Sequence, residues 1–293
     1  MHLFCTPYYR KKYPHEIICP GSAGTFTDAA SQVFSARHPE LNIAPDYHPT
    51  FDLVYNSVAP DGLGLLPLEN QLDGFVLATL QRLQSADVTE LGEVTVPVNF
   101  GLAARVDDMA KIKRIFVQFK TEGQCQNLLA NLPQAEIITT SSNMTSLEKL
   151  QAGDTGDAAI VPQSQMAALD FPLLQDNVAD QDDNATRFII FKKEPASLTA
   201  PDGTEAPTTA FKFPMFVTPP TEQPGVLREI LTHLADAGLN LVTIMSLPTR
   251  QKIGIYSFYI EVSGTFAQKA LLFETIGQMA AAYTVHPLGF YAL

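Results

Sequence analysis

Short apolar runs alternate with amphipathic helical patterns over the first two thirds of the chain, from Glu16 to about Glu194. Each run has the length of a buried strand, and the segment behind it carries apolar residues at helical spacing. The pairs are strand 17–19 with helix 27–38, strand 62–68 with helix 74–84, strand 114–118 with helix 122–132, and strand 158–162 with helix 163–169. This alternation predicts βαβ units and a mainly parallel sheet.

One long apolar stretch breaks the alternation. Residues 88–106 hold several strand-like pieces with no helix between them. Such a stretch can leave one α/β lobe, enter another and return later in the chain. The pattern therefore predicts a two-lobed first region, 1–194, with a cleft.

The composition changes after this region. Residues 192–210 are rich in Pro, Ala, Thr and charge, so 195–209 is expected to be a linker. Residues 210–293 then follow the ferredoxin-like order βαββαβ. The expected strands are 211–217, 239–247, 253–262 and 283–291, and the expected helices are 225–238 and 267–281.

One face of this second domain is expected to be covered by its own helices. In the first expected helix, apolar residues recur at helical spacing: Leu227, Ile230, Leu231 and Leu234. In the strand 253–262, alternate residues lie on one face: Tyr256, Phe258, Ile260 and Val262. Ile255 and Tyr259 point to the opposite face, so a partner copy or another domain is expected to cover it.

Composition limits the possible functions. The length of 293 residues suggests about two domains, and a net charge of -12 makes nucleic acid and anionic membranes improbable partners. No apolar segment approaches the roughly 20 residues that cross a bilayer. Residues 1–16 do not have the pattern of a secretion signal, so a cytoplasmic location is expected.

Common cofactor and metal signatures are absent from the sequence. Gly62 and Gly64 lack the third glycine of a dinucleotide fingerprint, and the six histidines have no metal-ligand spacing. Cys5, Cys19 and Cys125 are far apart and form no C-x-x-C pair. We therefore expect no cofactor and no metal.

Three polar clusters remain in the first region, each at a predicted strand end. Residues 21–27, with Gly21 and Gly24, lead into a helix expected to be capped by Thr27, where backbone N–H groups could face an anion. Residues 66–74 place Glu69 and Asn70 before a helix whose expected cap is Asp73. Residues 183–191 offer the hydroxyl of Thr186 and the guanidinium of Arg187. Each cluster alone could be an ordinary turn, but three of them could face one cleft.

At these residues the sequence resembles the prephenate dehydratase family over nearly its whole length. The family motif G-P-x-G-T-F-S is similar to Gly21–Thr27, P-I-E-N-S-x-E-G-S-V is similar to Pro67–Val76, and N-x-T-R-F is matched by Asn184–Phe188. The second domain resembles the family's ACT regulatory domain. The resemblance implies an α/β fold with a two-lobed periplasmic-binding-protein-like catalytic domain and a C-terminal ferredoxin-like ACT domain.

The resemblance also implies an activity, the conversion of prephenate to phenylpyruvate in phenylalanine biosynthesis. Thr186 matches the threonine that assists departure of the hydroxyl group, and Arg187 would bind a substrate carboxylate. The other expected substrate-binding residues are Asn70, Thr25, Ser22 and Phe188. Glu69 and Asn184 are expected to support them.

The sequence departs from the family at several positions. Gln71 and Phe75 replace small motif residues, and Gln118 falls near a family histidine. In the second domain the motif E-S-R-P is replaced by Met245-Ser246-Leu247-Pro248, which removes two charges from the expected phenylalanine site. The expected effector-binding residues are Gly225, Val226, Leu227, Asn240, Leu241 and Ser246.

Several alternatives stay open at this point. Arogenate dehydratases share the motifs, and a prephenate decarboxylase of similar fold would lose carbon dioxide without expelling the hydroxyl group. A cytoplasmic sensor of small anions or amino acids would use Arg187 for binding and perform no chemistry. A homodimer or homotetramer is expected, since ACT domains pair, although pairing could be the second domain's whole role.

Overall fold

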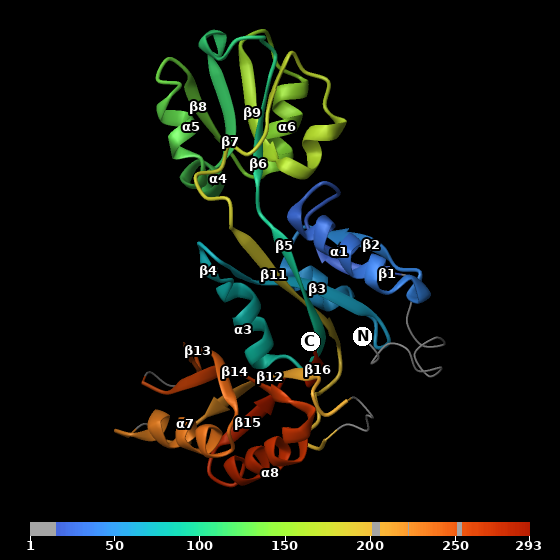
Figure 1. Ribbon diagram of the computed structural model, residues 1–293, viewed down its shortest axis with the longest axis vertical. Helices are drawn as coiled ribbons and strands as arrows, with labels where there is room; N and C mark the ends of the chain where they lie inside the picture. Colours follow the sequence, from blue (N-terminus) through green and yellow to red (C-terminus); the bar gives the residue numbers. More distant parts are fainter. Residues whose placement is uncertain (1–15, 201–205, 222, 251–253) are drawn as a thin grey trace.

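The computed structural model describes residues 16–200, 206–221, 223–250 and 254–293. The opening segment considered for a secretion signal, Cys5, part of the expected linker and Ile253 of an expected strand lie outside the described residues. Three sheets follow one another along the longest axis, with the second lobe at one end, the first lobe in the middle and the C-terminal domain at the other end (Figure 1).

The first lobe contains a mixed sheet in the order β2-β1-β3-β11-β5, with β4 paired to β3. Its elements are β1 (Glu16–Pro20), α1 (Phe26–Arg37), the 3-10 helix η2 (Pro39–Leu41), β2 (Ala44–His48), α2 (Phe51–Ser57), β3 (Leu63–Asn70), β4 (Gly74–Phe75), α3 (Leu77–Ser85), β5 (Thr89–Pro97) and β11 (Ala185–Lys192). β1 runs parallel to β2 and β3, whereas β11 runs antiparallel to both β3 and β5. The expectation of a mainly parallel sheet is therefore wrong, because the chain returns through β11 in the opposite direction.

The second lobe has the sheet order β10-β6-β9-β7-β8, in which β7 is parallel to β8 and β9, and β6 is antiparallel to β9 and β10. Its elements are β6 (Phe100–Ala104), η3 (Met109–Lys111), β7 (Arg114–Gln118), α4 (Phe119–Gln124), α5 (Gln126–Ala130), β8 (Glu136–Thr140), α6 (Asn143–Gln151), β9 (Asp157–Pro162), η4 (Gln163–Ala168) and β10 (Leu173–Gln175). The helix expected at 122–132 is interrupted at Cys125, and that expected at 163–169 is a 3-10 helix.

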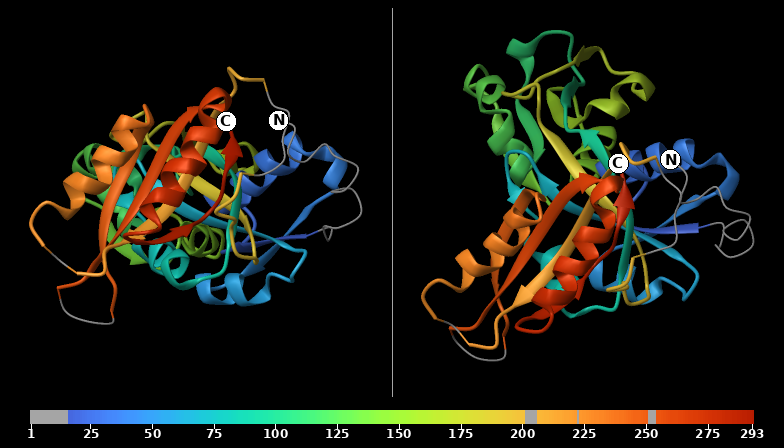
Figure 2. Two further views of the ribbon diagram at one scale, coloured as in Figure 1. Left: turned by 90° about the horizontal axis from the view of Figure 1, so that it is seen from below. Right: turned by 60° about the horizontal axis from the view of Figure 1, so that its bottom comes forward.

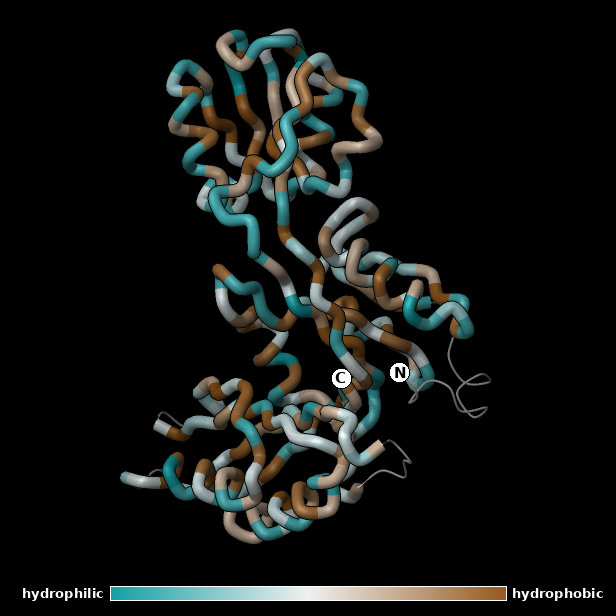
Figure 3. Tube along the Cα trace, in the orientation of Figure 1, coloured by the Kyte–Doolittle hydropathy of each residue, from teal (hydrophilic) through white to brown (hydrophobic). Residues whose placement is uncertain are grey.

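The chain crosses between the lobes twice, from β5 to β6 and from β10 to β11. The long apolar stretch 88–106 is thus divided between two sheets. The α/β, two-lobed, periplasmic-binding-protein-like fold class is confirmed by this arrangement. Apolar segments follow the strands of both lobes (Figure 3).

The C-terminal domain has the antiparallel order β13-β14-β12-β15, with β16 paired to β12. Its elements are β12 (Ala210–Thr218), α7 (Val226–Asp236), β13 (Asn240–Pro248), β14 (Tyr256–Thr265), η5 (Phe266–Gln268), α8 (Lys269–Met279), β15 (Thr284–Pro287) and β16 (Tyr291–Ala292). Both helices pack on one face, where Ile230 and Ile276 share a buried cluster with Ile260. The ferredoxin-like order is as expected.

The opposite face of this sheet packs on the first lobe, which two further views also show (Figure 2). Tyr259 and Leu247 are buried in one apolar cluster with Leu66 and Phe191 of the first-lobe sheet. A second contact joins the backbones, because the amide of Glu90 donates to the carbonyl of Leu288 at 2.5 Å. The prediction that another domain or a partner covers Tyr259 is confirmed: the chain's own first lobe does so.

Candidate active site

Consecutive side chains of β11 point to opposite faces of the first-lobe sheet, as strand geometry requires. Phe188 and Ile190 share a buried cluster with residues of α1, whereas Ile189 and Phe191 belong to the cluster shared with the C-terminal domain. Thr186 follows the first set and Arg187 the second. The hydroxyl and the guanidinium therefore serve different faces.

A β-bulge lies beside this pair. Thr186 pairs with Asn70 and Arg187 with Glu69, but Phe188 pairs with Pro67, so Leu68 is the extra residue of β3. The bulge changes the alternation of β3 and brings Asn70 to the face of Thr186 and Glu69 to the face of Arg187. Bulges often re-aim side chains next to active sites.

The side chain of Asn70 fixes the hydrogen bonding of Thr186. Its Oδ1 accepts from the backbone N–H groups of Leu72 and Asp73, both at 3.0 Å, which sets the orientation of the amide. Its Nδ2 then donates to Oγ1 of Thr186 at 2.9 Å and to the carbonyl of Ala185 at 3.2 Å. Since an amide nitrogen only donates, the hydroxyl of Thr186 accepts here and keeps its own proton for another partner.

The Gly-rich loop is held mainly by its own hydrogen bonds. Thr25, not Thr27, caps α1: its hydroxyl accepts from the N–H of Asp28 and donates to the carbonyl of Ser22 at 2.8 Å. Thr25 is the cap because it has extended backbone and directly precedes the first helical residue, Phe26. The carboxylate of Asp28 accepts from the N–H of Gly24 at 2.8 Å. Ser22 is exposed, and Thr25 is half-buried.

The second lobe approaches this loop closely. A side chain at Gly24, where φ is +84°, would meet the side-chain amide of Gln165 in η4 at about 3.0 Å. Phe26 of α1 and Phe100 of β6 pack edge to face with ring centroids 5.6 Å apart. The loop therefore lies where the two lobes meet.

The turn after β3 also reaches the second lobe. Asp73, expected to cap α3, instead accepts from Nζ of Lys120 in α4 at 3.1 Å. The residue before α3 is Val76, which has no side-chain capping bond. Gln118 caps α4 by accepting from the N–H groups of Lys120 and Thr121. An exposed cation of the second lobe is thus paired with Asp73, in the turn that follows Asn70.

Asn184 lies at the crossing between the lobes. It is buried, and its Nδ2 donates to Oε1 of Gln124 in α4 at 3.1 Å. Its Oδ1 is buried and has no hydrogen-bond partner among the described residues. Gln71, at a position where the family has serine, donates to Asp183 at 3.2 Å. These contacts fix the start of β11 against both lobes.

Arg187 is surrounded by carboxylates. It makes four hydrogen bonds, one to Glu69, one to Glu93 and two to Glu261 of β14. Binding of a substrate carboxylate by Arg187 stays a prediction, but in this structure four of its five N–H groups are already used. They are used on the face opposite Thr186.

Phe188 requires a correction. Its side chain is 2% exposed and packs in the cluster under α1 with Ile17, Leu65 and Val94. A ring enclosed in this way has no surface to offer a substrate. Phe188 is a core residue that anchors β11.

Glu93, which accepts from Arg187, has further partners in the C-terminal domain. Glu93 accepts from Nζ of Lys212 at 2.8 Å and from the hydroxyl of Tyr291 at 3.2 Å. Burial raises the pKa of Glu93, but the hydrogen bonds and charges of Lys212 and Arg187 outweigh it and hold this pKa below its usual range. Glu93 is therefore charged.

Glu90 has the opposite character. It is fully buried, and neither carboxyl oxygen has a partner among the described residues. Burial raises the pKa of Glu90 well above its usual range, the charges of Glu261 and Glu93 act in the same direction, and Arg187 and Lys212 oppose them. The surroundings of Glu90 therefore favour its protonated form.

Four residues of the site were not expected from the sequence: Glu93, Glu261, Lys212 and Lys120. The two glutamates lie inside strands whose other residues read as apolar runs, and a buried charge inside such a run is itself an indication of a partner. Which partner it meets depends on domain docking, which no local pattern contains.

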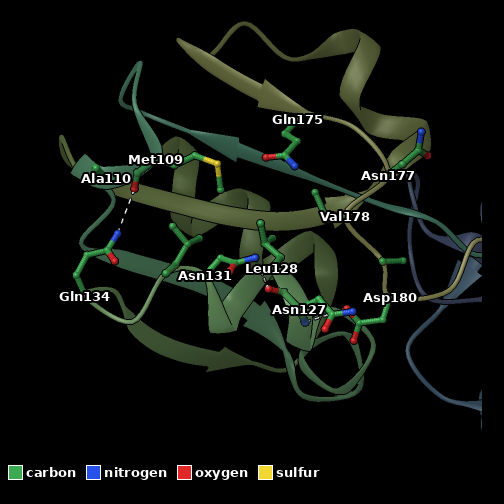
Figure 4. Close-up of a pocket in the computed structure, with 12 residues that line it drawn as sticks. Met109, Ala110, Asn127, Leu128, Asn131, Gln134, Gln175, Asn177, Val178 and Asp180 are labelled. Carbon is green, nitrogen blue, oxygen red and sulfur yellow. Dashed lines mark hydrogen bonds between the residues drawn. The ribbon is translucent and has the colours of Figure 1, made fainter.

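Two pockets lie away from Thr186 and Asn70, one in the second lobe and one in the C-terminal domain. A pocket of about 550 Å³ in the second lobe is lined by amide side chains that include Asn127, Asn131 and Gln175 (Figure 4), and none of the expected site residues lines it. A cavity of about 270 Å³ in the C-terminal domain is lined by Gly225, Val226 and Leu227, together with Tyr256 and Phe258.

The other expected effector residues are placed differently. Asn240, Leu241 and Ser246 lie on β13 and are not among the described residues lining this cavity. Leu247, where the family motif has arginine, is 2% exposed and packs against the first lobe. A charged group at that position would be buried among apolar side chains.

Two negative findings apply to the described ranges. No group of three or more His, Cys, Asp and Glu side chains within them could hold a metal ion. Across the same ranges, every helix is too short or too polar to span a bilayer.

The fold and the site together define a class of protein: a two-lobed α/β protein with a C-terminal ACT-like domain, in which Asn70 holds the hydroxyl of Thr186 at the start of β11. A family model described as prephenate dehydratase matches residues 17–196. A prephenate dehydratase of Amycolatopsis methanolica is 30% identical over 250 residues, which cover 85% of this chain and 79% of that protein.

Solved structures agree. A prephenate dehydratase of Arthrobacter aurescens in complex with L-Phe is 28% identical, with a TM-score of 0.76 and coverage of 95% of this chain and 90% of that one. The enzyme of Staphylococcus aureus shares the fold, with 21% identity, a TM-score of 0.73 and coverage of 95% and 100%. The chain belongs to the prephenate dehydratase family. Its activity is that of a carbon–oxygen lyase acting on prephenate in phenylalanine biosynthesis.

Proposed function

We propose that Thr186 donates a hydrogen bond to the hydroxyl oxygen that leaves prephenate. The hydrogen bond from Asn70 carries this proposal, because it makes Thr186 an acceptor toward Asn70 and leaves the Oγ proton directed elsewhere. A placed donor aimed at developing negative charge is a large contributor to catalysis in a site that excludes water.

The reaction needs this assistance at one point. The bond from the ring to its carboxylate breaks, carbon dioxide leaves, and the electron pair moves through the diene. The bond to the hydroxyl group on the opposite ring carbon then breaks, and the departing hydroxide takes up a proton to become water. Thr186 is a weak acid, so its hydrogen bond strengthens as charge develops, and the proton comes ultimately from solvent.

The remaining site residues have supporting roles in this proposal. Asn70 orients Thr186. The hydrogen bond from the hydroxyl of Thr25 to the carbonyl of Ser22 holds the Gly-rich loop in its conformation. Lys120 of the second lobe is exposed and pairs with Asp73, so it would supply positive charge by exchanging that carboxylate for one of the substrate. A protein with net charge -12 needs such a local cation to admit a dianionic substrate.

The direct test uses the purified protein. It is incubated with prephenate at neutral pH, and phenylpyruvate is measured against a protein-free control that corrects for spontaneous conversion. A parallel assay with arogenate separates the arogenate dehydratase alternative. A non-aromatic product would indicate decarboxylation alone, and ligand-induced stabilisation without turnover would indicate a sensor.

For regulation, we propose that L-phenylalanine binds in the cavity lined by Gly225, Val226 and Leu227. Support comes from the relative described in complex with L-Phe and from the two aromatic side chains in this cavity. Calorimetric titration with phenylalanine, with tyrosine as the comparison, tests it. Absence of binding would leave pairing of copies as the role of this domain.

A homodimer or homotetramer in the cytoplasm completes the proposal. β13 is an edge strand, and Leu241, Val242 and Ile244 on it are 39%, 40% and 37% exposed. An edge strand with exposed apolar side chains is a surface that a second copy can cover. Light scattering of the wild type and of Ile244→Lys measures the assembly, and an unchanged monomer mass in both would contradict it.

A further inference from the structure

The contact between Arg187 and Glu261 joins the first-lobe sheet to the C-terminal domain. Nη1 lies 2.7 Å from Oε1 and Nη2 lies 2.9 Å from Oε2, so two parallel hydrogen bonds connect the guanidinium and the carboxylate. This fork geometry fixes both distance and angle between the groups. β11 and β14 are therefore held in one relative placement at this point.

The surroundings make this pair hard to exchange for water. Glu261 is fully buried, and the side chain of Arg187 is 11% exposed. The only other described donor to Glu261 is the hydroxyl of Tyr259, at 2.8 Å. Removing one member of a buried ion pair leaves an uncompensated charge in an apolar interior. The C-terminal domain thus provides the principal counter-charge of Arg187, which lies in the first-lobe sheet.

Arg187 is the immediate neighbour of Thr186, and the two share a peptide unit. At this point β11 pairs regularly with β5 but through a bulge with β3, so the ladder on the Asn70 side is the irregular one. A side chain held rigidly on one face then determines how its neighbour is presented on the other. Glu69 and Glu93 hold Nη2 and Nη1 from the first lobe at 3.0 and 3.1 Å.

We propose that Arg187 is a positioning residue through which Glu261 of the C-terminal domain orients Thr186 for the reaction. This inference rests on the proposed role of Thr186. It differs from the expected binding of a substrate carboxylate by Arg187, because such a contact affects substrate binding, whereas a positioning residue affects the chemical step. Any change in the C-terminal domain that moves Glu261 would then alter turnover.

The experiment compares steady-state kinetics of full-length variants. Glu261→Gln keeps size and shape but removes the charge, and Arg187→Lys keeps the charge but removes the fork. We expect each to lower kcat about tenfold or more with KM changed by less than about twofold. In the Thr186→Ala background, Glu261→Gln should cause no further loss, since a residue that acts through Thr186 has nothing left to orient.

Asp157→Asn supplies a matched control. Asp157 also forms a two-bond fork with an arginine, accepting from Nε and Nη2 of Arg114 at 2.6 and 2.7 Å, and it is buried inside the second lobe. It should lose stability to denaturant without lowering kcat. If Glu261→Gln does not fold, Arg187→Lys and its double variant with Thr186→Ala decide the question.

Three results would overturn the inference. The first is an unchanged kcat in both Glu261→Gln and Arg187→Lys, and the second is a raised KM at constant kcat. The third is that Glu261→Gln lowers kcat by the same factor in the Thr186→Ala background as in the wild type. Failure of the proposed function looks different: the wild type would form no phenylpyruvate, or Thr186→Ala would be as active as the wild type.

Discussion

Asn70 and Thr186 lie directly opposite each other on β3 and β11, with Nδ2 of the amide 2.9 Å from the threonine Oγ1. The two backbone amides that bind Oδ1 of Asn70 leave its nitrogen as the group facing Thr186. The direction of this single hydrogen bond determines where the threonine proton can go.

Thr186→Ala removes the donor and should lower kcat about 10²- to 10³-fold, the usual effect of deleting one placed donor to developing charge. Thr186→Ser keeps the hydroxyl and serves as the control, with kcat within about tenfold of the wild type. Phenylpyruvate formation at saturating prephenate measures both. Near-normal turnover of the alanine variant would exclude Thr186 from the reaction.

Asn70→Asp tests the direction of the hydrogen bond with almost no change in shape. A carboxylate can only accept, so the hydroxyl of Thr186 would turn to donate to it and would no longer be free for the leaving group. We expect kcat to fall about 10- to 100-fold while the fold, measured by circular dichroism, is retained. Wild-type kcat in this variant would show that Thr186 does not need its free proton.

The sequence predicts more of the fold than of the site. Helix and strand periods placed α1, β7, β9, α7 and β12 within a few residues, and the composition change at 192–210 precedes β12. These elements depend on local patterns. The sequence also indicated that the clusters of Asn70 and Thr186 could face one cleft, but their direct hydrogen bond is known only from the structure.

Other features depend on distant contacts. The bulge at Leu68 decides which face Asn70 occupies, and an alternation pattern read along β3 alone gives the opposite face. Arg187 looked free because its partner Glu261 is 74 residues away, in another domain. Its environment could be known only after the domains had docked.

Glu90 should make stability depend on pH. Its pKa in the folded protein is raised well above 4.5, so the folded state holds a proton that the unfolded state releases. Its contribution is fully present below about pH 4.5 and is lost as pH rises toward the folded-state pKa. Glu93 has a lowered pKa in the folded protein, so its effect on stability has the opposite pH dependence. Its contribution is present above about pH 4.5 and is lost as pH falls through its folded-state pKa.

Glu90→Gln removes the ionisation but keeps the shape. Urea unfolding at several values between about pH 5 and pH 8 should show a free energy of unfolding that falls with pH more steeply in the wild type than in the variant. Glu16→Gln, at an exposed end of β1, is the control and should follow the wild type. Parallel curves for Glu90→Gln and the wild type would mean that Glu90 is already charged in the folded state.

Gly289 tests the docking of the C-terminal domain without touching any charge. Its backbone passes so close to the carbonyl of Glu90 that an added Cβ would overlap it, and a backbone group cannot move aside cheaply. Gly289→Ala should therefore reduce the free energy of unfolding by about 1–3 kcal/mol, the usual cost of overpacking, and also lower kcat because Glu261 shifts with its domain. Gly92→Ala on β5 is the matched control, since a Cβ there meets no atom within 4 Å. Equal stability and equal turnover in the two alanine variants would show that this close approach does not hold the domains together.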